Sequence, residues 1–460
     1  MHCGYVVEVK EIRKHTNADR LQVATFFGSD TIVDLTVKVG DLGVYFPVDL
    51  QLSEEFCEHN NLVRKKDENG NNVGGFLDPD KRNIKAINLR GEKSDGLFMP
   101  IRAFGYCYEG PEEAMFALNV GDQVTVVNGH EICKKYIPKR QHRQGSYSAG
   151  NKTRKTKAPY APLFAEHADT EQLAYNLGAF KNNDEVEITL KMHGTSQRTA
   201  YLPVLKGYKK TFWDKLTKKQ GTPVYEYDYV CGTRRVVLED FESGNSFYGS
   251  NSFREKHHNA FVGKLNKGET VYYEVVGFTD NDAPIMSSAD NNKVGKDFVK
   301  IYGSQTVFSY GCSIDGTKTL HGVDDQGVFS IVEELPKSDL YVYRMTMTNE
   351  DGFTVEYTPD FMRYRCEQMG VKSVMVFDKF TIPAKNPFPG EYVMTRAEKY
   401  CDGPDPVGKT HTREGVVVRI LNRPKFSAFK LKCWNFKLLE GLVKDTATAP
   451  DMEEAQEVQE

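Results

Sequence analysis

The sequence lacks several features that would mark a membrane protein or a secreted protein. None of its apolar runs approaches the roughly 18 residues that a membrane-spanning helix requires. Residues 1–10 do not show the basic-then-apolar pattern of a secretion signal. The nine cysteines include no CxxC pair, which excludes a zinc ribbon and argues against a dense disulfide framework. We therefore expect an intracellular protein of a reducing compartment, cytoplasmic or nuclear, with no membrane partner.

The chain also lacks an excess of charge of one sign. Lys and Arg number 60 against 64 Asp and Glu, which gives a net charge of −4. This balance excludes binding to nucleic acid through a positive charge spread over the whole surface, so a nucleic-acid surface must come from local patches. The 460 residues, 39% hydrophobic and 27% charged, suffice for two or three domains of roughly 150 residues each.

Charge is concentrated in three segments. Residues 134–160 hold nine of the basic residues and no acid among 134–157, together with Gly and Ser, and are predicted to form a basic linker. This linker is either a solvated tether or an arm that contacts phosphates. The lysine-rich insert 206–219 coats the surface or contacts RNA. The acidic residues 446–460 are predicted to form a disordered tail.

Residues 1–133 contain short β-rich runs separated by glycines. Such runs, with little helical periodicity, predict a small barrel. An oligonucleotide-binding (OB) barrel is a natural candidate, but strand spacing alone does not separate it from an SH3-like barrel or a sandwich. The runs are 6–9, 21–24, 31–33, 43–46 and 123–127.

A second domain, 161–445, contains a lysine at the end of a predicted strand. In 185–191 apolar and polar residues alternate, which places Lys191 on the polar face. His193 and Gly194 follow, and the glycine permits a close backbone approach to a ligand. A lysine in this position is usually only solvated, so the assignment depends on the rest of the domain. The other strands predicted there are 225–231, 270–278, 340–347, 415–421 and 426–433.

Three further charged features accompany Lys191. Glu274 lies within an otherwise apolar strand, and Glu414 immediately precedes another. Lys430 and Lys432 are two residues apart, so both ammonium groups lie on one face of their strand. Two like charges side by side favour an anion between them, which indicates phosphate binding.

In this order, these segments resemble the motifs of the covalent nucleotidyltransferase superfamily of ATP-dependent ligases and capping enzymes. His193, where an aspartate is common, and Ser196, where DNA ligases and capping enzymes carry arginine, indicate an RNA ligase. The matching segments are Lys191-Met-His193-Gly194, Gly232-Thr233-Arg234, Tyr273-Glu274, Tyr341-Val-Tyr343-Arg344, Glu414-Gly415 and Lys430-Leu-Lys432.

The amino-terminal region carries a second resemblance. Segments 13–21 and 90–96 are similar to parts of the OB domain in one branch of ATP-dependent RNA ligases. Members of that branch carry this domain before the transferase domain and seal nicks whose 3′-OH strand is RNA. The same segments also resemble tRNA-binding domains.

The resemblance implies an α+β fold, with an OB-like β-barrel followed by an antiparallel-sheet nucleotidyltransferase (ATP-grasp-like ligase) domain. It implies ATP and Mg²⁺ or Mn²⁺ as cofactors, and RNA or an RNA-containing nicked duplex as the partner of a monomeric enzyme. Lys191 becomes the nucleophile that forms lysyl-AMP. The implied catalytic residues are Lys191, Glu274, Glu414, Lys430 and Lys432, with Glu274 and Glu414 as metal ligands. The implied nucleotide-binding residues are Lys191, His193, Gly194, Arg234, Glu274, Lys430, Lys432 and Tyr343, with Tyr341 as the alternative to Tyr343.

Two other functions compete with this interpretation. One is a non-catalytic OB-containing protein that binds RNA or tRNA, and the other is a DNA ligase-like nick sealer or guanylyltransferase.

Residues 403–410 fit the P-loop pattern GxxxxGK[ST], but a P-loop is a weaker candidate for the nucleotide site. Pro404 and Pro406 remove backbone donors, and a strand follows instead of a helix. We expect a loop that leads to Glu414.

Overall fold

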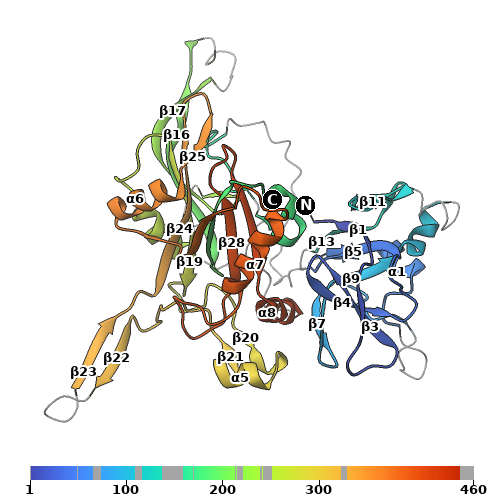
Figure 1. Ribbon diagram of the computed structural model, residues 1–460. Coiled ribbons are helices and arrows are strands. Elements are labelled where there is room, and N and C mark those ends of the chain that lie inside the picture. The colour runs from blue at the N-terminus through green and yellow to red at the C-terminus, as the bar shows by residue number, and fades with distance from the viewer. Residues whose placement is uncertain are drawn as a thin grey trace. The chain divides into compact units, whose positions relative to one another are not determined.

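The computed structural model divides the chain into two compact units, Met1–Lys139 and Arg140–Glu460 (Figure 1). Each unit has its own hydrophobic core and is described by itself. Most of the predicted linker, part of the lysine-rich insert and the predicted acidic tail lie outside the described residues. The structure describes residues 2–48, 50–65, 74–108, 117–136, 159–168, 170–212, 214, 221–238, 241, 251–322 and 329–445.

The first unit is built from short antiparallel strands. One sheet has four strands in the order β10-β1-β5-β9, one has three in the order β2-β3-β4, and three are two-stranded. Among the described residues no pairing closes these sheets into one barrel, so the unit is β-rich as predicted but the closed barrel is not seen. The strands are β1 (Gly4–Glu8), β2 (Ile12–Lys14), β3 (Leu21–Phe26), β4 (Ser29–Asp34), β5 (Leu42–Phe46), β6 (Leu50–Leu52), β7 (Ala86–Leu89), β8 (Glu92–Asp95), β9 (Leu97–Pro100), β10 (Gln123–Val124), β11 (Val126–Val127), β12 (His130–Glu131) and β13 (Cys133–Lys135), with helices α1 (Glu54–His59) and η1 (Ile101–Cys107).

The two segments that carry the OB-like resemblance pack against each other. Arg13 donates to both carboxylate oxygens of Glu92, at 2.8 and 2.7 Å, and Asn17 Nδ2 donates to the carbonyl of Arg90 at 2.9 Å. Hydrogen bonds from Arg13 lower the pKa of Glu92 to about 2. These contacts join the segment that contains β2 to the β7–β8 hairpin.

The first unit extends beyond the predicted boundary at residue 133. Lys134 and Lys135 belong to β13 and pair with Gln51 and Leu50 of β6, and Tyr136 is buried. The first two residues of the predicted linker are therefore held by backbone hydrogen bonds of a sheet.

The second unit contains two large sheets that are almost wholly antiparallel. One has five strands in the order β14-β29-β28-β15-β27, and the other has seven, in the order β18-β17-β16-β19-β24-β25 with β26 beside β24. This confirms the prediction of antiparallel sheets. The strands are β14 (Glu171–Gln172), β15 (Glu185–Lys191), β16 (Thr195–Lys209), β17 (Thr222–Gly232), β18 (Val237–Leu238), β19 (Glu269–Gly277), β20 (Ala289–Asp290), β21 (Gln305–Thr306), β22 (Thr317–Gly322), β23 (Phe329–Glu334), β24 (Ser338–Thr348), β25 (Thr354–Glu356), β26 (Lys372–Ser373), β27 (Val376–Thr381), β28 (Gly415–Ile420) and β29 (Ser427–Lys432). The helices are η2 (Leu173–Tyr175), η3 (Leu177–Ala179), α4 (Ser252–Asn259), η4 (Asn291–Lys293), α5 (Lys296–Tyr302), α6 (Pro359–Met369), α7 (Pro389–Cys401) and α8 (Trp434–Asp445).

Two hydrophobic clusters include residues of the five-stranded sheet. Leu190 and Met192, at the end of β15, join a cluster that includes Val275 of the seven-stranded sheet. Val393 of α7 packs in a second cluster with Val418 of β28, and Figure 1 shows α7 lying over β28. The end of β15 is thus connected by its apolar side chains to the core of the seven-stranded sheet.

Helix α6 is bounded by local signals in its sequence. The Thr358 side chain accepts from the backbone N–H of Phe361 at the N-terminus, and Pro359 occupies the first turn. Gly370 ends the helix in the left-handed conformation, with φ 67°. This placement brings Met362 to the pocket described below.

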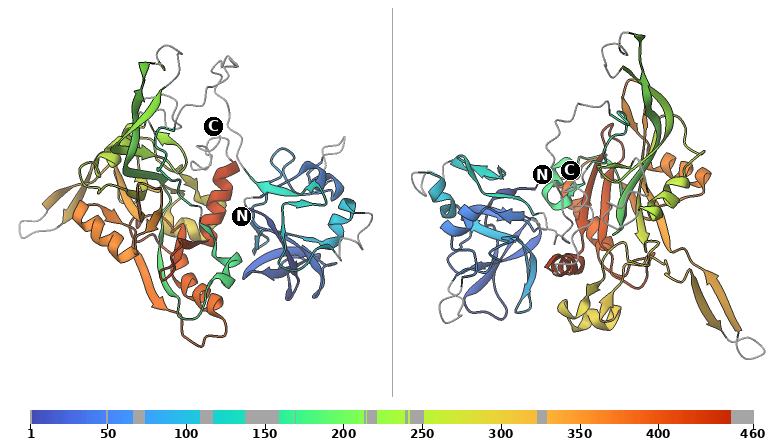
Figure 2. Two further views of the ribbon diagram at one scale, coloured as in Figure 1. Left: turned by 90° about the horizontal axis from the view of Figure 1, so that it is seen from above. Right: turned by 180° about the vertical axis from the view of Figure 1, so that it is seen from behind.

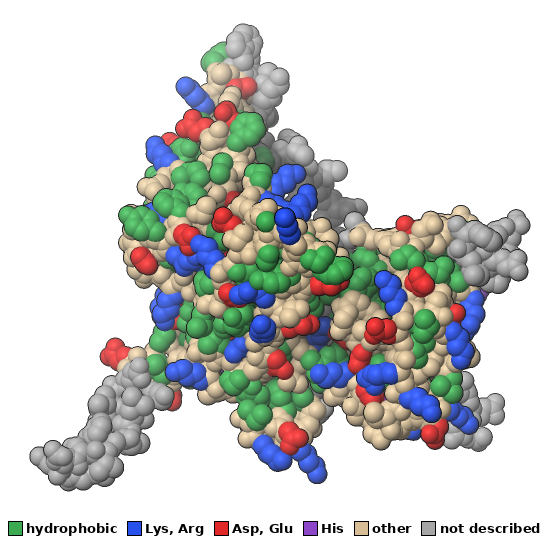
Figure 3. Space-filling view, viewed as in Figure 1, with side chains coloured by type: hydrophobic (Ala, Val, Ile, Leu, Met, Phe, Trp, Pro, Cys, Tyr) green, Lys and Arg blue, Asp and Glu red, His purple; other side chains and the backbone are tan. Residues whose placement is uncertain are grey.

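The β22–β23 hairpin extends away from the rest of the second unit in all views (Figure 2). Within the described residues, no helix is both long and apolar enough to span a membrane. Figure 3 shows Lys and Arg side chains interspersed with Asp and Glu on one face, as the near-balanced composition predicts.

The six strands predicted in this unit are confirmed. Strand 185–191 has the predicted bounds, and the strands predicted at 270–278, 415–421 and 426–433 differ from β19, β28 and β29 by one residue at one or both ends. Strands 225–231 and 340–347 lie within the longer β17 and β24.

Candidate active site

Three strands of the five-stranded sheet align the predicted basic residues in rows. Lys191 of β15 pairs with Gly415 of β28, which pairs with Lys432 of β29. One row further along, Thr189 pairs with Val417 and Val417 with Lys430. Because residues two apart share a face, Lys191, Lys430 and Lys432 project from the same side of the sheet.

Glu414 reaches Lys191 because it directly precedes this row. Lys191 Nζ lies 2.8 Å from Glu414 Oε1, and Lys432 Nζ lies 3.6 Å from the same oxygen. Lys432 Nζ also lies 2.6 Å from Glu440 Oε2 on α8. Gly415 permits this packing because a Cβ there would lie 2.0 Å from the Leu431 carbonyl oxygen. The structure therefore brings Lys191, Glu414 and Lys432 together.

The seven-stranded sheet contributes the opposite wall. Ser196 of β16 pairs with Glu274 of β19, and both line the same pocket as Lys191. Gly194 connects β15 to β16, and a Cβ at this position would lie 2.4 Å from the Val275 carbonyl oxygen. The glycine after the predicted nucleophile thus allows the two strands to approach.

Tyr343 and Tyr341 have different environments although they are two residues apart on β24. The pairing register of β24 with β19 shifts at Tyr343, since Arg344 pairs with Tyr272 but Val342 pairs with Tyr273. Such a shift re-aims a side chain. Tyr343 lines the pocket, and its hydroxyl lies 2.8 Å from Ser196 Oγ, whereas Tyr341 is buried in the core.

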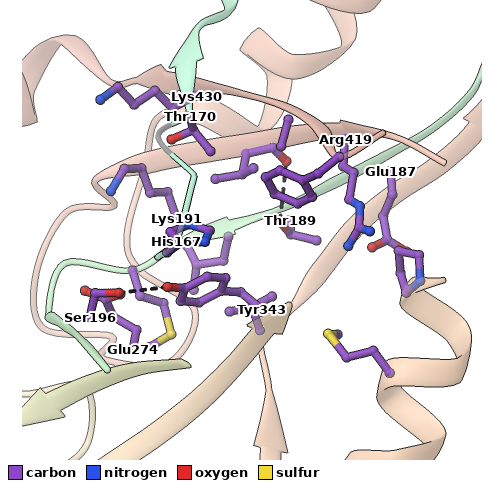
Figure 4. Close-up of a pocket in the computed structure, with 18 of the residues that line it drawn as sticks. His167, Thr170, Glu187, Thr189, Lys191, Ser196, Glu274, Tyr343, Arg419 and Lys430 are labelled. Carbon is purple, nitrogen blue, oxygen red and sulfur yellow. Dashed lines mark hydrogen bonds between the residues drawn. The ribbon is translucent and has the colours of Figure 1, made fainter. Parts of the chain in front are cut away.

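The pocket lies between these two sheets (Figure 4). Lys191, Lys430, Glu274, Tyr343 and Arg234 are among the predicted residues that line it. The other lining residues are His167, Thr170, Glu187, Thr189, Leu190, Met192, Ser196, Pro359, Met362, Val374, Val417, Arg419, Phe426 and Ala428.

Comparison with known proteins identifies the fold. No family model matches the chain, and no curated protein matches it. Among solved structures, a Naegleria gruberi RNA ligase mutant with AMP and Mn is similar with a TM-score of 0.54 and 17% identity, covering 95% of this chain and 98% of that one. Another mutant of this ligase, with ATP and Mn, has a TM-score of 0.53 and 17% identity, and the match covers 96% of this chain and 98% of that one. The ligase with PPi has a TM-score of 0.52 and 16% identity, and the match covers 94% of this chain and 96% of that one. The chain has the fold of these RNA ligases.

His193 lies beside Lys191 within this RNA ligase fold, but it is not among the residues that line the pocket. Its ring packs edge-on against Phe308 and Phe436, with centroids 4.8 and 4.7 Å apart. Its Nδ1 lies 3.9 Å from Glu414 Oε2, and its backbone N–H donates to the Tyr310 hydroxyl at 2.7 Å. The structure therefore places His193 behind the nucleophile, against an aromatic cluster.

His167 is a pocket residue that the sequence reading missed. Arg344 Nη1 lies 3.2 Å from His167 Nδ1, and an arginine can only donate, so the neutral ring carries its proton on Nε2. Burial, with nearby Arg344, Arg234 and Arg198, lowers the pKa of His167 well below its usual value. A lone histidine before the first motif offers no sequence signal of this role.

The sequence analysis also did not predict the charged contacts of other residues that line the pocket, which are an ion pair and two arginines over an aromatic ring. Glu187 accepts from Arg363 at 3.1 and 2.8 Å. The guanidinium carbons of Arg344 and Arg419 lie 4.5 and 4.9 Å from the Phe426 ring centroid. Glu187 was predictable, because it shares the alternating face of β15 with Lys191.

The carboxylates of Glu274 and Glu414 fit the ligand chemistry of Mg²⁺ or Mn²⁺. Glu414 is buried, and its Oε2 has no hydrogen-bond partner among the described residues. In the part of the chain that the structure describes, no three or more His, Cys, Asp or Glu side chains gather in a group that could hold a metal. Magnesium is often bound by one or two carboxylates with waters and substrate phosphates, so two acids are sufficient.

The P-loop-like segment 403–410 is a loop, as expected. It follows α7 and precedes β28, so no strand leads into it and no helix follows it. Within it, Asp405 Oδ1 accepts from the backbone N–H of Val407 and of Gly408, both at 2.8 Å. Burial raises the pKa of Asp405 and lowers that of the buried His411.

Proposed function

We propose that this protein is an ATP-dependent RNA ligase that seals nicks in duplexes through lysyl-AMP and RNA-adenylate intermediates. The observation that carries the proposal is the row of Lys191, Gly415 and Lys432, which sets Lys191 Nζ 2.8 Å from the buried Glu414 at a pocket that Lys191 lines. The shared fold supports it, because the similar Naegleria gruberi structures are RNA ligases with ATP, AMP or PPi.

The first step is attack by Lys191 Nζ on the α-phosphorus of ATP. A nitrogen–phosphorus bond forms, the bond from the α-phosphorus to the bridging oxygen breaks, and pyrophosphate leaves with that electron pair. The amine loses its protons to solvent. Lysine is a nucleophile only as the neutral amine, so its ion pair with Glu414 must first be released.

Glu274 and Glu414 would hold Mg²⁺ or Mn²⁺, and such a cation would neutralise phosphate charge and lower the proton affinity of nearby groups. A Glu414 carboxylate held in this way would no longer favour the ammonium form of Lys191. Lys430 and Lys432 then neutralise negative charge at the α-phosphate, where it develops during the reaction.

The remaining pocket residues bind the nucleoside and orient it. Tyr343 stacks on adenine, since its ring lines the pocket and its hydroxyl is anchored by Ser196. Arg234, with its planar fork, binds ribose or the RNA 5′-phosphate. Glu274 also contacts the ribose hydroxyls. Gly194 lets β15 and β16 approach closely beside the pocket, and His193 supports Lys191 from behind.

Two further displacements complete sealing. The RNA 5′-phosphate oxygen attacks the lysyl-AMP phosphorus, which frees Lys191 and forms RNA-adenylate. The 3′-OH of the other strand then attacks the RNA 5′-phosphorus and AMP leaves. We propose that the first unit is an OB-like module that holds the duplex near the nick, with the basic segment 134–160 as its connection to the second unit.

Sealing of defined nicked duplexes by the purified protein tests this function. The 3′-OH strand and the 5′-phosphate strand are made of RNA or DNA separately, with ATP or GTP. We expect sealing with ATP when the 3′-OH strand is RNA. Sealing only with a DNA 3′-OH strand indicates a DNA ligase, reaction with GTP indicates a guanylyltransferase, and RNA binding without adenylylation indicates a non-catalytic protein.

A further inference from the structure

Tyr310 has a backbone conformation that bulky residues rarely adopt. It lies in the turn 309–312, where the Cys312 N–H donates to the Ser309 carbonyl at 2.9 Å. Tyr310 has φ 50° and Gly311 has φ 78°. A turn with positive φ at both central residues normally takes Gly, Asn or Asp. A tyrosine persists there only if its surroundings fix it, and such strain is common near active sites.

The contacts of Tyr310 supply that constraint. Its side chain is only 2% exposed, and its hydroxyl accepts from the backbone N–H of His193 at 2.7 Å. Its ring packs edge-on against His411, with centroids 4.6 Å apart. His193 follows Lys191 by two residues, and His411 precedes Glu414 by three. The Tyr310 side chain therefore contacts both the segment that follows Lys191 and the segment that precedes Glu414.

The same cluster gives the P-loop-like segment a structural role. A Cβ at Gly408 would lie 2.1 Å from His411 Nε2, so the glycine makes room for the buried His411 ring. The backbone N–H of Asp405 donates to the His411 carbonyl at 2.8 Å, which closes the loop around that ring. Phe308 packs edge-on against both His411 and His193 at 5.4 and 4.8 Å.

We propose that Tyr310 is a positioning residue for lysyl-AMP formation, which fixes His193 and His411 and thereby the approach of Lys191 to Glu414. The inference depends on the proposed ligase function. Tyr310 does not line the nucleotide pocket. It should therefore affect the rate at which bound ATP reacts and leave ATP binding unchanged, because small displacements of reacting groups slow a reaction strongly.

Single-turnover transfer of label from [α-³²P]ATP to the full-length protein tests this proposal. Tyr310→Phe keeps the ring and removes the acceptor for His193. We expect the rate at saturating ATP to fall about tenfold or more while the half-saturating ATP concentration stays within about twofold. Tyr45→Phe is the matched control, because Tyr45 is also buried and its hydroxyl donates to a backbone carbonyl, that of Asp95, in the other unit. It should retain the wild-type rate.

A second variant keeps the proposal testable if Tyr310→Phe does not fold. Gly408→Ala forces the His411 ring to move and should lower the same rate without raising the half-saturating ATP concentration. Gly178→Ala is its control, since a Cβ there meets nothing within 4 Å. Wild-type rates in both Tyr310→Phe and Gly408→Ala would overturn the positioning role alone. An unlabelled wild-type protein would overturn the ligase function as well.

Discussion

Lys191 and Glu414 show how far single residues can be understood from their positions on neighbouring strands. The row that pairs Lys191 with Gly415 places the preceding Glu414 against the amine, 2.8 Å away. Lys432 Nζ lies 3.6 Å from the same Glu414 oxygen. In the proposed mechanism Lys191 attacks as the neutral amine, so its contact with Glu414 has to be released first.

Removal of divalent cations tests this view of the Lys191–Glu414 pair. We expect chelation with EDTA to reduce lysyl-AMP formation to background and Mg²⁺ or Mn²⁺ to restore it, since the ion pair then keeps Lys191 protonated. Label transfer from [α-³²P]ATP is the measurement. Undiminished labelling after chelation would show that the two carboxylates do not act through a metal.

Tyr343 is predicted to bind the base by stacking. Tyr343→Ala should raise the half-saturating ATP concentration about tenfold or more, because loss of one stacking side chain costs about 1–3 kcal/mol. Tyr343→Phe keeps the ring and loses the hydroxyl that contacts Ser196, so it should stay within about threefold. ATP titration of label transfer gives both values. Equal effects of the two changes would argue against stacking.

Residue-level prediction from sequence succeeded where alternation along one strand was sufficient. The two-residue period placed Lys430 and Lys432 on one face of their strand and Lys191 on the polar face of its own, and the strand pairing puts all three on one side of the sheet. The choice between Tyr343 and Tyr341 depends on a register shift against β19, which no local pattern reveals. His167 was missed because only the folded chain brings it beside Arg344.

Among the elements, helix α6 is tied to the seven-stranded sheet by a buried ion pair. Arg365 Nη2 lies 2.8 Å from Glu269 Oε2 of β19, and Glu269 has no exposed surface. The Tyr357 hydroxyl also donates to Glu269, at 3.0 Å. The carboxylate is stable in this position only because its partners compensate for the loss of water. Its pKa is lowered despite the opposing effect of burial.

Arg365→Ala should destabilise the second unit by about 3–5 kcal/mol, since it leaves Glu269 buried without its cation. Calorimetry of the full-length protein, in which the two units can unfold separately, is the measurement. Lys300→Ala is the comparison, because the Lys300–Asp297 pair is exposed and should contribute less than about 1 kcal/mol. Similar small effects of both substitutions would contradict a structural role for the buried pair.

The strands were easier to predict than the helices and the sheets they form. Apolar alternation gave β15 its bounds and the other five predicted strands to within a few residues, but the long β16 was not predicted. Sheet order depends on pairings distant in sequence, such as β15 with β28, and no local periodicity encodes them. In the first unit the same limit applies: the five predicted runs overlap β1, β3, β4, β5, β10 and β11, whereas the other strands were not predicted and closure into a barrel is not seen among the described residues.

For the whole molecule, we propose that the division into two units separates adenylylation from RNA handling. The described pocket residues all belong to the second unit, which has its own core. A protein that contains only residues 159–460 should therefore form lysyl-AMP but lose most of its nick sealing. Label transfer and sealing, measured side by side with the full-length protein, test this. Full sealing by the shorter protein would show that the first unit is dispensable for RNA.

The most direct test of the account is to locate the adenylate. After incubation with ATP and Mn²⁺, mass spectrometry of the wild-type protein and of Lys191→Met should show one adenylate on the wild-type peptide that contains Lys191 and none on the variant. Added pyrophosphate should remove the adenylate. Adenylate on another residue, or equal modification of the variant, would contradict the assignment of Lys191 as the nucleophile.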